Sequence, residues 1–145
     1  MSQPKAPAIH CEEFTVPESV IDRNGHVNNV AFVQWMQDVA TCHFDSGGVT
    51  ETMEAAGGTW VARSHHIEYL RPAFAGEHIQ ALTWIVDFSR VRSLRRYKFL
   101  RASDGKLLVR GETDWVFVNA KSGRPCSIPE EIKRAFVTVS PEQEP

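Results

Sequence analysis

One long apolar segment constrains the fold of this chain more than any other feature. Between Val30 and Phe44 nearly every side chain is apolar. The polar residues within it recur every three or four positions, so on a helix they form one narrow stripe. Because such a helix is apolar around most of its circumference, other elements must cover it, most simply a curved sheet. The polar stripe consists of Gln34, Gln37, Asp38, Thr41 and Asp45.

Capping signals define both ends of this helix. Asn28 and Asn29 are both good N-caps, and the glycine pair at 47–48 is a typical C-terminal stop. We therefore predict a central helix over residues 29–45. Its N-terminus would carry free N–H groups and a partial positive charge, which suit a developing oxyanion.

The rest of the chain is rich in β-forming residues. Residues 107–119 alternate clearly between apolar and polar side chains, and Asp104-Gly105 just before them is a strong hairpin signal. Consecutive strands joined by tight connections predict an antiparallel meander. The expected fold is thus α+β, with a curved antiparallel sheet wrapped around one long central helix. We predict strands at 9–16, 59–71, 78–88, 91–102 and 107–119, and short helices at 49–56 and 129–136.

Length and composition limit the classes of protein to consider. The 145 residues predict one domain, 1–145, with a core at about 9–139 and loose termini. A net charge of -2 gives no support for a nucleic-acid partner. The 3 cysteines are widely spaced, so neither a zinc site nor a disulfide framework is indicated. Without a signal-peptide core or a membrane-length apolar run, we expect a cytoplasmic protein with no membrane partner.

A polar loop over residues 22–29 precedes the central helix and carries the candidate catalytic side chains. Asp22 could activate water or attack a substrate directly, whereas the alternative is a surface acid that makes an Asx turn. Asn24 could hold water or orient Asp22, or could be a turn residue beside Gly25. His26 could donate to a carbonyl or tune the acid, or could bond only to backbone.

At this point the residues resemble a known family. The Asp-x-Asn-x-His-x-Asn-Asn pattern at 22–29 is similar to that of the hot-dog-fold thioesterases, more closely the acyl-CoA and 4-hydroxybenzoyl-CoA thioesterase group and the plant acyl-acyl-carrier-protein thioesterases. Further matching runs lie at 67–73, 76–77, 83–84, 115–118 and 123–125. The order and spacing of all these runs, rather than any single one, make the resemblance specific from about residue 14 to 136.

The resemblance implies a role for each loop residue. An acid before the central helix attacks the thioester or activates water, and Asp22 stands at that position. Asn24 and His26 match catalytic residues of the plant enzymes. A backbone N–H at the helix start, that of Asn29 or its neighbour Asn28, would polarise the carbonyl. The plant enzymes have two tandem repeats and a further catalytic acid or cysteine, whereas this chain has one repeat and offers neither between residues 57 and 66.

Several residues outside the loop are candidates for substrate binding. Ser64 and His66 share one face of a predicted strand, which could reach the cleft or serve a structural role. Arg92 and Arg95 belong to a basic hairpin that could bind the phosphates of CoA, or could simply protect a strand edge. Asn28 is foremost a helix cap, and through its N–H it is also a candidate substrate-binding residue.

We therefore expect a thioester hydrolase, an acyl-CoA thioesterase that acts as a homodimer or homotetramer. Its substrate is an acyl-CoA, and no metal or other cofactor is expected, with coenzyme A entering only as part of the substrate. One rival is a non-catalytic hot-dog module that binds acyl-CoA or acyl-carrier protein. Another is an enoyl-CoA hydratase or dehydratase on the same fold.

Overall fold

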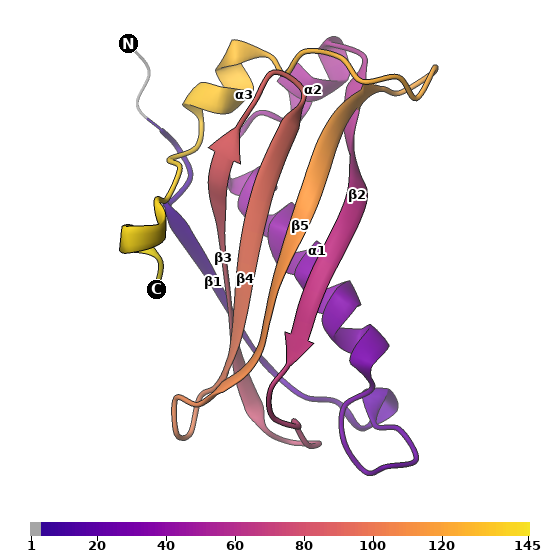
Figure 1. Cartoon of the computed structure of the whole chain (residues 1–145), viewed down its shortest axis with the longest axis vertical. Helices are drawn as coiled ribbons and strands as arrows, with labels where there is room; N and C mark the ends of the chain where they lie inside the picture. The colour runs from indigo at the N-terminus through magenta and orange to yellow at the C-terminus, as the bar shows by residue number, and fades with distance from the viewer. Residues whose placement is uncertain (1–3) are drawn as a thin grey trace.

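A computed structural model describes residues 4–145 (Figure 1). One antiparallel sheet is formed by β1 (Ile9–Thr15), β2 (Gly58–Tyr69), β3 (His78–Phe88), β4 (Arg92–Arg101) and β5 (Leu107–Asn119). The helices are α1 (Asn29–Ser46), α2 (Thr50–Ala55) and α3 (Glu130–Arg134), with short 3-10 turns η1 (Glu18–Val20) and η2 (Pro141–Gln143). No helix within residues 4–145 is both long and apolar enough to cross a membrane.

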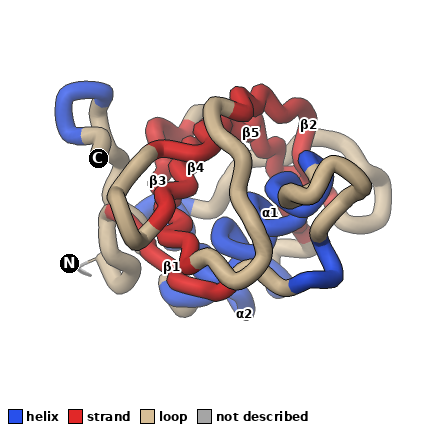
Figure 2. The backbone as a smooth tube through the Cα atoms, turned by 90° about the horizontal axis from the view of Figure 1, so that it is seen from below, coloured by secondary structure: helices blue, strands red, loops and turns tan. Residues whose placement is uncertain are grey.

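The central helix lies in the hollow of the curved sheet, as the sequence predicted. Seen along the sheet, the strands arc around one side of α1 (Figure 2). The opposite side of α1 is open in the protomer, and Val30 in its first turn is 70% exposed. The expected α+β architecture is confirmed, but one protomer covers only part of the apolar helix. The side chains of α1 that are buried against the sheet are Phe32, Met36, Val39, Ala40 and His43.

The strand order differs from the simple meander that we expected. The order is β1-β3-β4-β5-β2, so β3, β4 and β5 form a meander while β2 occupies the far edge beside β5. The connection 70–77 causes this difference, because it runs past the end of the sheet instead of turning back. At its start the Leu70 N–H donates to Leu108 O at 2.8 Å, and near its end the Gly76 N–H donates to Val16 O at 2.9 Å.

The C-terminal tail is held against the sheet more closely than we expected. Val139 donates its N–H to Ile85 O at 2.8 Å. Farther on, Glu144 accepts a hydrogen bond from Arg96 of β4. We had placed the end of the core at about residue 139, because the sequence beyond it is polar and gives no signal for these contacts.

Candidate active site

A tight hairpin carries the predicted catalytic loop. Ile21 and Val27 face each other in an antiparallel bridge. Between them the Asp22 N–H donates to His26 O at 3.0 Å, and the Gly25 N–H donates to Asp22 O at 3.0 Å. Gly25 has a φ of 83°, which glycine adopts without steric cost and which closes such three-residue loops. Asp22 and His26 therefore flank a single turn.

The hairpin is fixed to the start of α1, at the lower right of Figure 1. The Val27 N–H donates to Ala73 O at 2.8 Å, in the connection that crosses the end of the sheet. Tyr69, the last residue of β2, donates its hydroxyl to Asn29 O at 3.0 Å. The first turn of α1, the hairpin and the end of β2 thus form one continuous unit.

The two asparagines at the helix start have different hydrogen bonds. Asn28 is the N-cap, and its Oδ1 accepts the Val30 N–H at 2.9 Å. The Asn28 N–H is itself occupied, because it donates to Val20 O at 2.8 Å. Among the described residues, the Asn29 N–H donates no hydrogen bond. Of the two amides that the sequence offered for an oxyanion, only that of Asn29 is free.

The three loop side chains are grouped but make few contacts with one another. Asp22 Oδ1 accepts the Asn24 N–H at 2.9 Å, which is the Asx turn that we considered as the structural alternative. Asn24 itself is exposed. His26 is half-buried, with Nδ1 3.4 Å from Val27 O. Within the described residues, Asp22 Oδ2 has no donor, so one carboxylate oxygen remains available.

The pairing of β2 with β5 decides which side chains of β2 face α1. Gly111 of β5 faces the helix, since a β-carbon added there would lie 3.2 Å from the Met36 side chain. Its neighbour Glu112 therefore points to the outer face of the sheet. His66 pairs with Glu112, so His66 points outward as well.

Ser64 and His66 do not lie on the helix side, where we expected them to contact substrate. Ser64 pairs with Asp114, two residues from Glu112, and so shares the outer face. His65 faces α1 instead, with its Nδ1 2.8 Å from Thr113 Oγ1. The sequence predicted the alternation correctly, but only the register of the sheet reveals which set of side chains faces the helix.

The two arginines that we grouped as a phosphate dock lie on opposite faces of β4. Arg92 is exposed, and its Nε donates to Asp114 Oδ1 at 3.1 Å on the outer face. Arg95 is only 5% exposed and points toward α1. An odd separation along a strand turns two side chains apart, so Arg92 and Arg95 cannot bind one group together.

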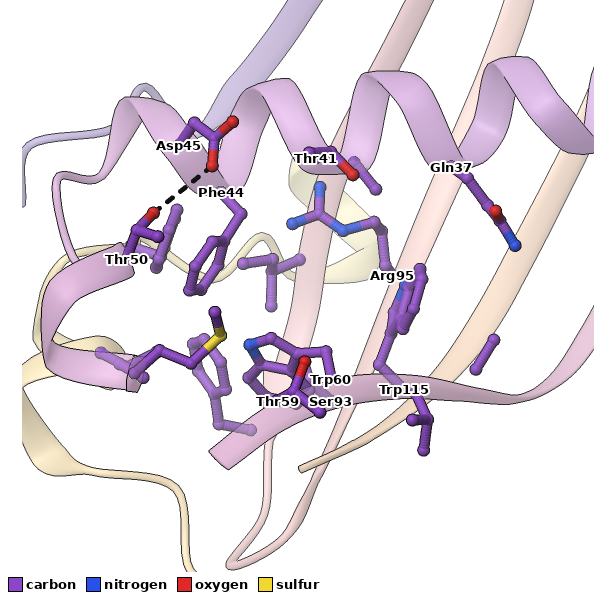
Figure 3. Close-up of a pocket in the computed structure, with 18 residues that line it drawn as sticks. Gln37, Thr41, Phe44, Asp45, Thr50, Thr59, Trp60, Ser93, Arg95 and Trp115 are labelled. Carbon is purple, nitrogen blue, oxygen red and sulfur yellow. Dashed lines mark hydrogen bonds between the residues drawn. The ribbon is translucent and has the colours of Figure 1, made fainter. Parts of the chain in front are cut away.

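A cavity of about 550 Å³ lies between the C-terminal half of α1, α2 and the sheet (Figure 3). Gln37, Thr41 and Asp45 from the polar stripe of α1 line one side of it. We had expected this stripe to face solvent or an interface. Along α1 the cavity begins about 12 Å from the helix start that adjoins the Asp22 hairpin, at 1.5 Å per residue from position 29 to 37. Aromatic walls are supplied by Phe44, Trp60, Phe88, Trp115 and Phe136.

The described part of the chain contains no cluster of side chains that could bind a metal ion. No three His, Cys, Asp or Glu side chains there are gathered closely enough to hold a metal ion.

Comparison with known proteins identifies the family. The family model of the thioesterase-like superfamily matches residues 16–136, most of the chain. The chain belongs to the thioesterase-like superfamily. This match covers the Asp22 hairpin, α1 and all of the sheet except β1.

Curated relatives of this thioesterase-like chain are longer proteins. It is 26% identical over 128 residues to an L-carnitine dehydrogenase/betainyl-CoA thioesterase of Ruegeria pomeroyi, covering 88% of the chain and 26% of the relative. It is 30% identical over 117 residues to a chloroplastic palmitoyl-acyl carrier protein thioesterase of Gossypium hirsutum, covering 77% of the chain and 25% of the relative. The chain thus spans about a quarter of the length of these relatives.

Solved structures share the fold at low sequence identity. A 1,4-dihydroxy-2-naphthoyl-CoA thioesterase from Synechocystis superposes with a TM-score of 0.79 at 19% identity, covering 88% of this chain and 94% of that one. A hypothetical protein from Staphylococcus aureus, solved in complex with CoA, gives a TM-score of 0.81 at 21% identity, covering 98% and 95%. The thioesterase-like chain therefore has the hot-dog fold that the sequence motifs implied.

Proposed function

We propose that the chain hydrolyses an acyl-CoA thioester to the free acid and CoA. The observation that carries this proposal is the unpaired N–H of Asn29 at the N-terminus of α1, beside the hairpin that holds Asp22. A free amide at the positive end of an 18-residue helix is suited to a developing oxyanion. Membership of the thioesterase-like superfamily and the CoA thioesters named for its relatives support this reaction.

In the proposed reaction the thioester carbonyl oxygen accepts the Asn29 N–H. Asp22 either removes a proton from water that adds to the carbonyl carbon, or attacks that carbon to form an anhydride that water then opens. In both routes the C–S bond breaks and the CoA thiolate takes up a proton. Asn24 and His26 would orient the water or Asp22 from the same turn, and no cofactor beyond the CoA of the substrate takes part.

The outer edge of β2 supports a homodimer, alone or paired into a tetramer. β2 is a 12-residue edge strand whose central side chains are exposed. Long unprotected edges pair readily, and identical chains most often pair through a two-fold axis. Exposed apolar side chains extend along the same edge, namely Val61, Tyr69 and Leu70. We propose antiparallel pairing of β2 with the β2 of a second copy.

Such pairing would unite the separated halves of the site. Tyr69 at one end of β2 contacts the start of α1, whereas Trp60 near the other end lines the cavity. Antiparallel pairing about the middle of β2 places the Tyr69 end of one protomer beside the Trp60 end of its partner. The thioester would then lie at the Asp22 hairpin of one protomer, with the acyl group in the cavity of the other.

The test is release of free thiol from a panel of acyl-CoAs. Replacement of Asp22 by Asn should lower kcat by at least ~100-fold, the lower range for a positioned acid–base group. Glu18→Gln is a matched control, because Glu18 is an exposed acid on the same connection whose carboxylate has no partner among residues 4–145. The control should keep wild-type turnover.

Near-wild-type turnover by a folded Asp22→Asn variant would reject the assignment. If the wild type binds acyl-CoAs but releases no thiol from any of them, the chain is an acyl-binding module instead. Addition of water to an enoyl-CoA without thiol release would identify it as a hydratase.

A further inference from the structure

Arg95 is a buried cation that has no carboxylate partner among the described residues. Its side chain comes from β4 and reaches between the sheet and α1, toward Thr41 and Phe44 (Figure 3). Burial lowers the pKa of the guanidinium to about 10, so it remains charged at neutral pH. Buried charges are normally paired, since an unpaired charge in a low-dielectric interior is costly. Arg95 is therefore exceptional, because its buried positive charge has no counter-ion among the described residues.

Two neutral side chains hold one end of this guanidinium. Arg95 Nη1 lies 2.9 Å from His43 Nδ1 and donates to Thr83 Oγ1 at 3.0 Å. His43 Nε2 lies 2.8 Å from Pro7 O, which can only accept, so the His43 proton is on Nε2 and Nδ1 is an acceptor. Thr83 donates its own hydroxyl to Arg96 O at 3.0 Å. Both hydrogens of Nη1 are thereby used.

The opposite edge of the guanidinium, formed by Nε and Nη2, remains free. Neither nitrogen has an acceptor among the described residues, and Arg95 lines the cavity. This edge presents two parallel N–H groups, the geometry that binds a carboxylate through both oxygens. Arg92 in the same strand uses this edge in that way, since its Nε and Nη2 donate to the two carboxylate oxygens of Asp114.

The cavity around this free edge is otherwise largely apolar. Asp45 is its single carboxylate; it is exposed, accepts the Thr50 hydroxyl at 3.4 Å and forms no ion pair with Arg95. A ligand that fills this space must therefore bring an acceptor, and one negative charge would neutralise the site.

We propose that this cavity binds an acyl group that ends in a carboxylate, with the Nε/Nη2 edge of Arg95 holding that carboxylate. The preferred substrates are then acyl-CoAs with a second, distal carboxyl group on an aliphatic or aromatic acyl chain. This inference rests on the proposed thioester hydrolysis and names the substrate class of that site. The several phosphate charges of CoA fit poorly here, because one buried guanidinium among aromatic walls can neutralise only one of them.

Paired substrates of equal chain length test the proposal. Glutaryl-CoA and pentanoyl-CoA differ only by the distal carboxylate, and longer pairs such as adipyl-CoA and hexanoyl-CoA probe the depth of the cavity. The wild type should favour the carboxylate member of at least one pair by ~10-fold or more in kcat/KM. Arg95→Met should lower kcat/KM for that member by at least about 30-fold and change the neutral member by less than about threefold.

Two further variants separate binding from general damage. Arg95→Lys keeps the positive charge but loses the two parallel N–H groups. Its kcat/KM for the carboxylate substrate should therefore lie between those of the wild type and Arg95→Met. Arg110→Met is the control, because Arg110 lies on the outer face, is paired with Glu68 at 2.7 Å and carries the same charge. The control should retain the wild-type preference.

The outcomes distinguish failure of this inference from failure of the hydrolase proposal. Equal or faster hydrolysis of every neutral member, or an equal loss on both members in Arg95→Met, would overturn the carboxylate site alone. If no acyl-CoA is hydrolysed, the hydrolase proposal fails. Thermal unfolding in the presence of monomethyl glutarate then tests the carboxylate site independently of hydrolysis. That monoanion should raise the Tm of the wild type, whereas neutral dimethyl glutarate should not, and Arg95→Met should not respond; no Tm shift in the wild type would overturn the site.

Discussion

His43 Nδ1 lies 2.9 Å from Nη1 of the buried Arg95. Burial, followed by the charge of Arg95, lowers the pKa of His43 to about 4. A protonated imidazole at this position would face the guanidinium and would lose Nδ1 as an acceptor. The position of Arg95 in the cavity therefore depends on a neutral histidine. A second titratable group, His10, also contacts His43. The two rings stack with 5.4 Å between their centroids.

We predict that stability falls as the pH is lowered from about 6.5 to about 4. In this window the unfolded chain binds a proton at residue 43, whose ordinary pKa is 6.5, while the folded protein does not. Because the unfolded state binds more protons, the free energy of unfolding decreases as the pH falls. The full effect is about 3 kcal/mol at 1.36 kcal/mol per pKa unit. Urea unfolding at pH 7.5, 5.5 and 4.5 measures it.

His43→Gln isolates the contribution of this residue. The variant should be less stable at pH 7.5, since it disturbs a buried hydrogen-bond chain, but its stability should vary less between pH 6.5 and 4. If the two proteins show parallel pH profiles, other groups account for the loss and His43 is not neutral in the way we describe.

The N-cap of α1 offers a test that separates stability from catalysis. Asn28→Ala removes the acceptor of the Val30 N–H and should cost about 1 kcal/mol of unfolding free energy. Asn28→Ser should restore both stability and kcat. Asn28→Asp should restore stability but keep kcat low, because its charge would lie beside the amide that stabilises the oxyanion. Equal kcat for the Ser and Asp variants would argue against an oxyanion at this helix end.

The elements of the fold were predictable because each has a local signal. The central helix was predicted at 29–45 and is found at Asn29–Ser46, since two asparagines and two glycines define its ends. The strands at His78–Phe88 and Leu107–Asn119 match their predicted ranges. The order of the strands was not predictable in the same way. Nothing local in residues 70–77 indicates that they cross the end of the sheet.

The candidate site was only partly predictable for the same reason. The hairpin residues adjoin one another in the sequence, so Asp22, Asn24 and His26 could be grouped from spacing alone. The cavity brings Arg95 to His43 and Thr83, which are 52 and 12 residues away in the chain. Their contact depends on the sheet register and on the strand face, neither of which the sequence shows. A single arginine in a basic hairpin looks like its exposed neighbours until its face is known.

Gly25 provides a second test of the hairpin. Gly25→Ala must adopt a φ of 83°, so strain should cost roughly 1 kcal/mol, although nothing lies within 4 Å of an added β-carbon. The strain falls on the turn between Asp22 and His26, so kcat should fall as well. Gly123→Ala is the matched control, because Gly123 has a φ of 73° in a remote turn that is equally open. It should lose similar stability, measured by urea unfolding, with unchanged kcat.

Complementation between two inactive variants tests whether the site is shared between protomers. Asp22→Asn and Arg95→Met are each expected to hydrolyse poorly, as homodimers, the carboxylate-bearing acyl-CoA that the wild type prefers. In the proposed dimer, a heterodimer of the two has one site with both substitutions and one site with neither. With random pairing, half of the dimers are heterodimers, so co-expression should recover about a quarter of wild-type activity.

The alternative arrangement predicts a different value. If Asp22 and Arg95 of the same protomer served one substrate, every site in the mixture would contain one substitution and co-expression would recover no activity. Purification through two different affinity tags isolates the heterodimer, whose activity should then rise to about half of the wild type, one intact site of two. A heterodimer as inactive as its parents would reject the shared site while leaving the roles of Asp22 and Arg95 to their own tests.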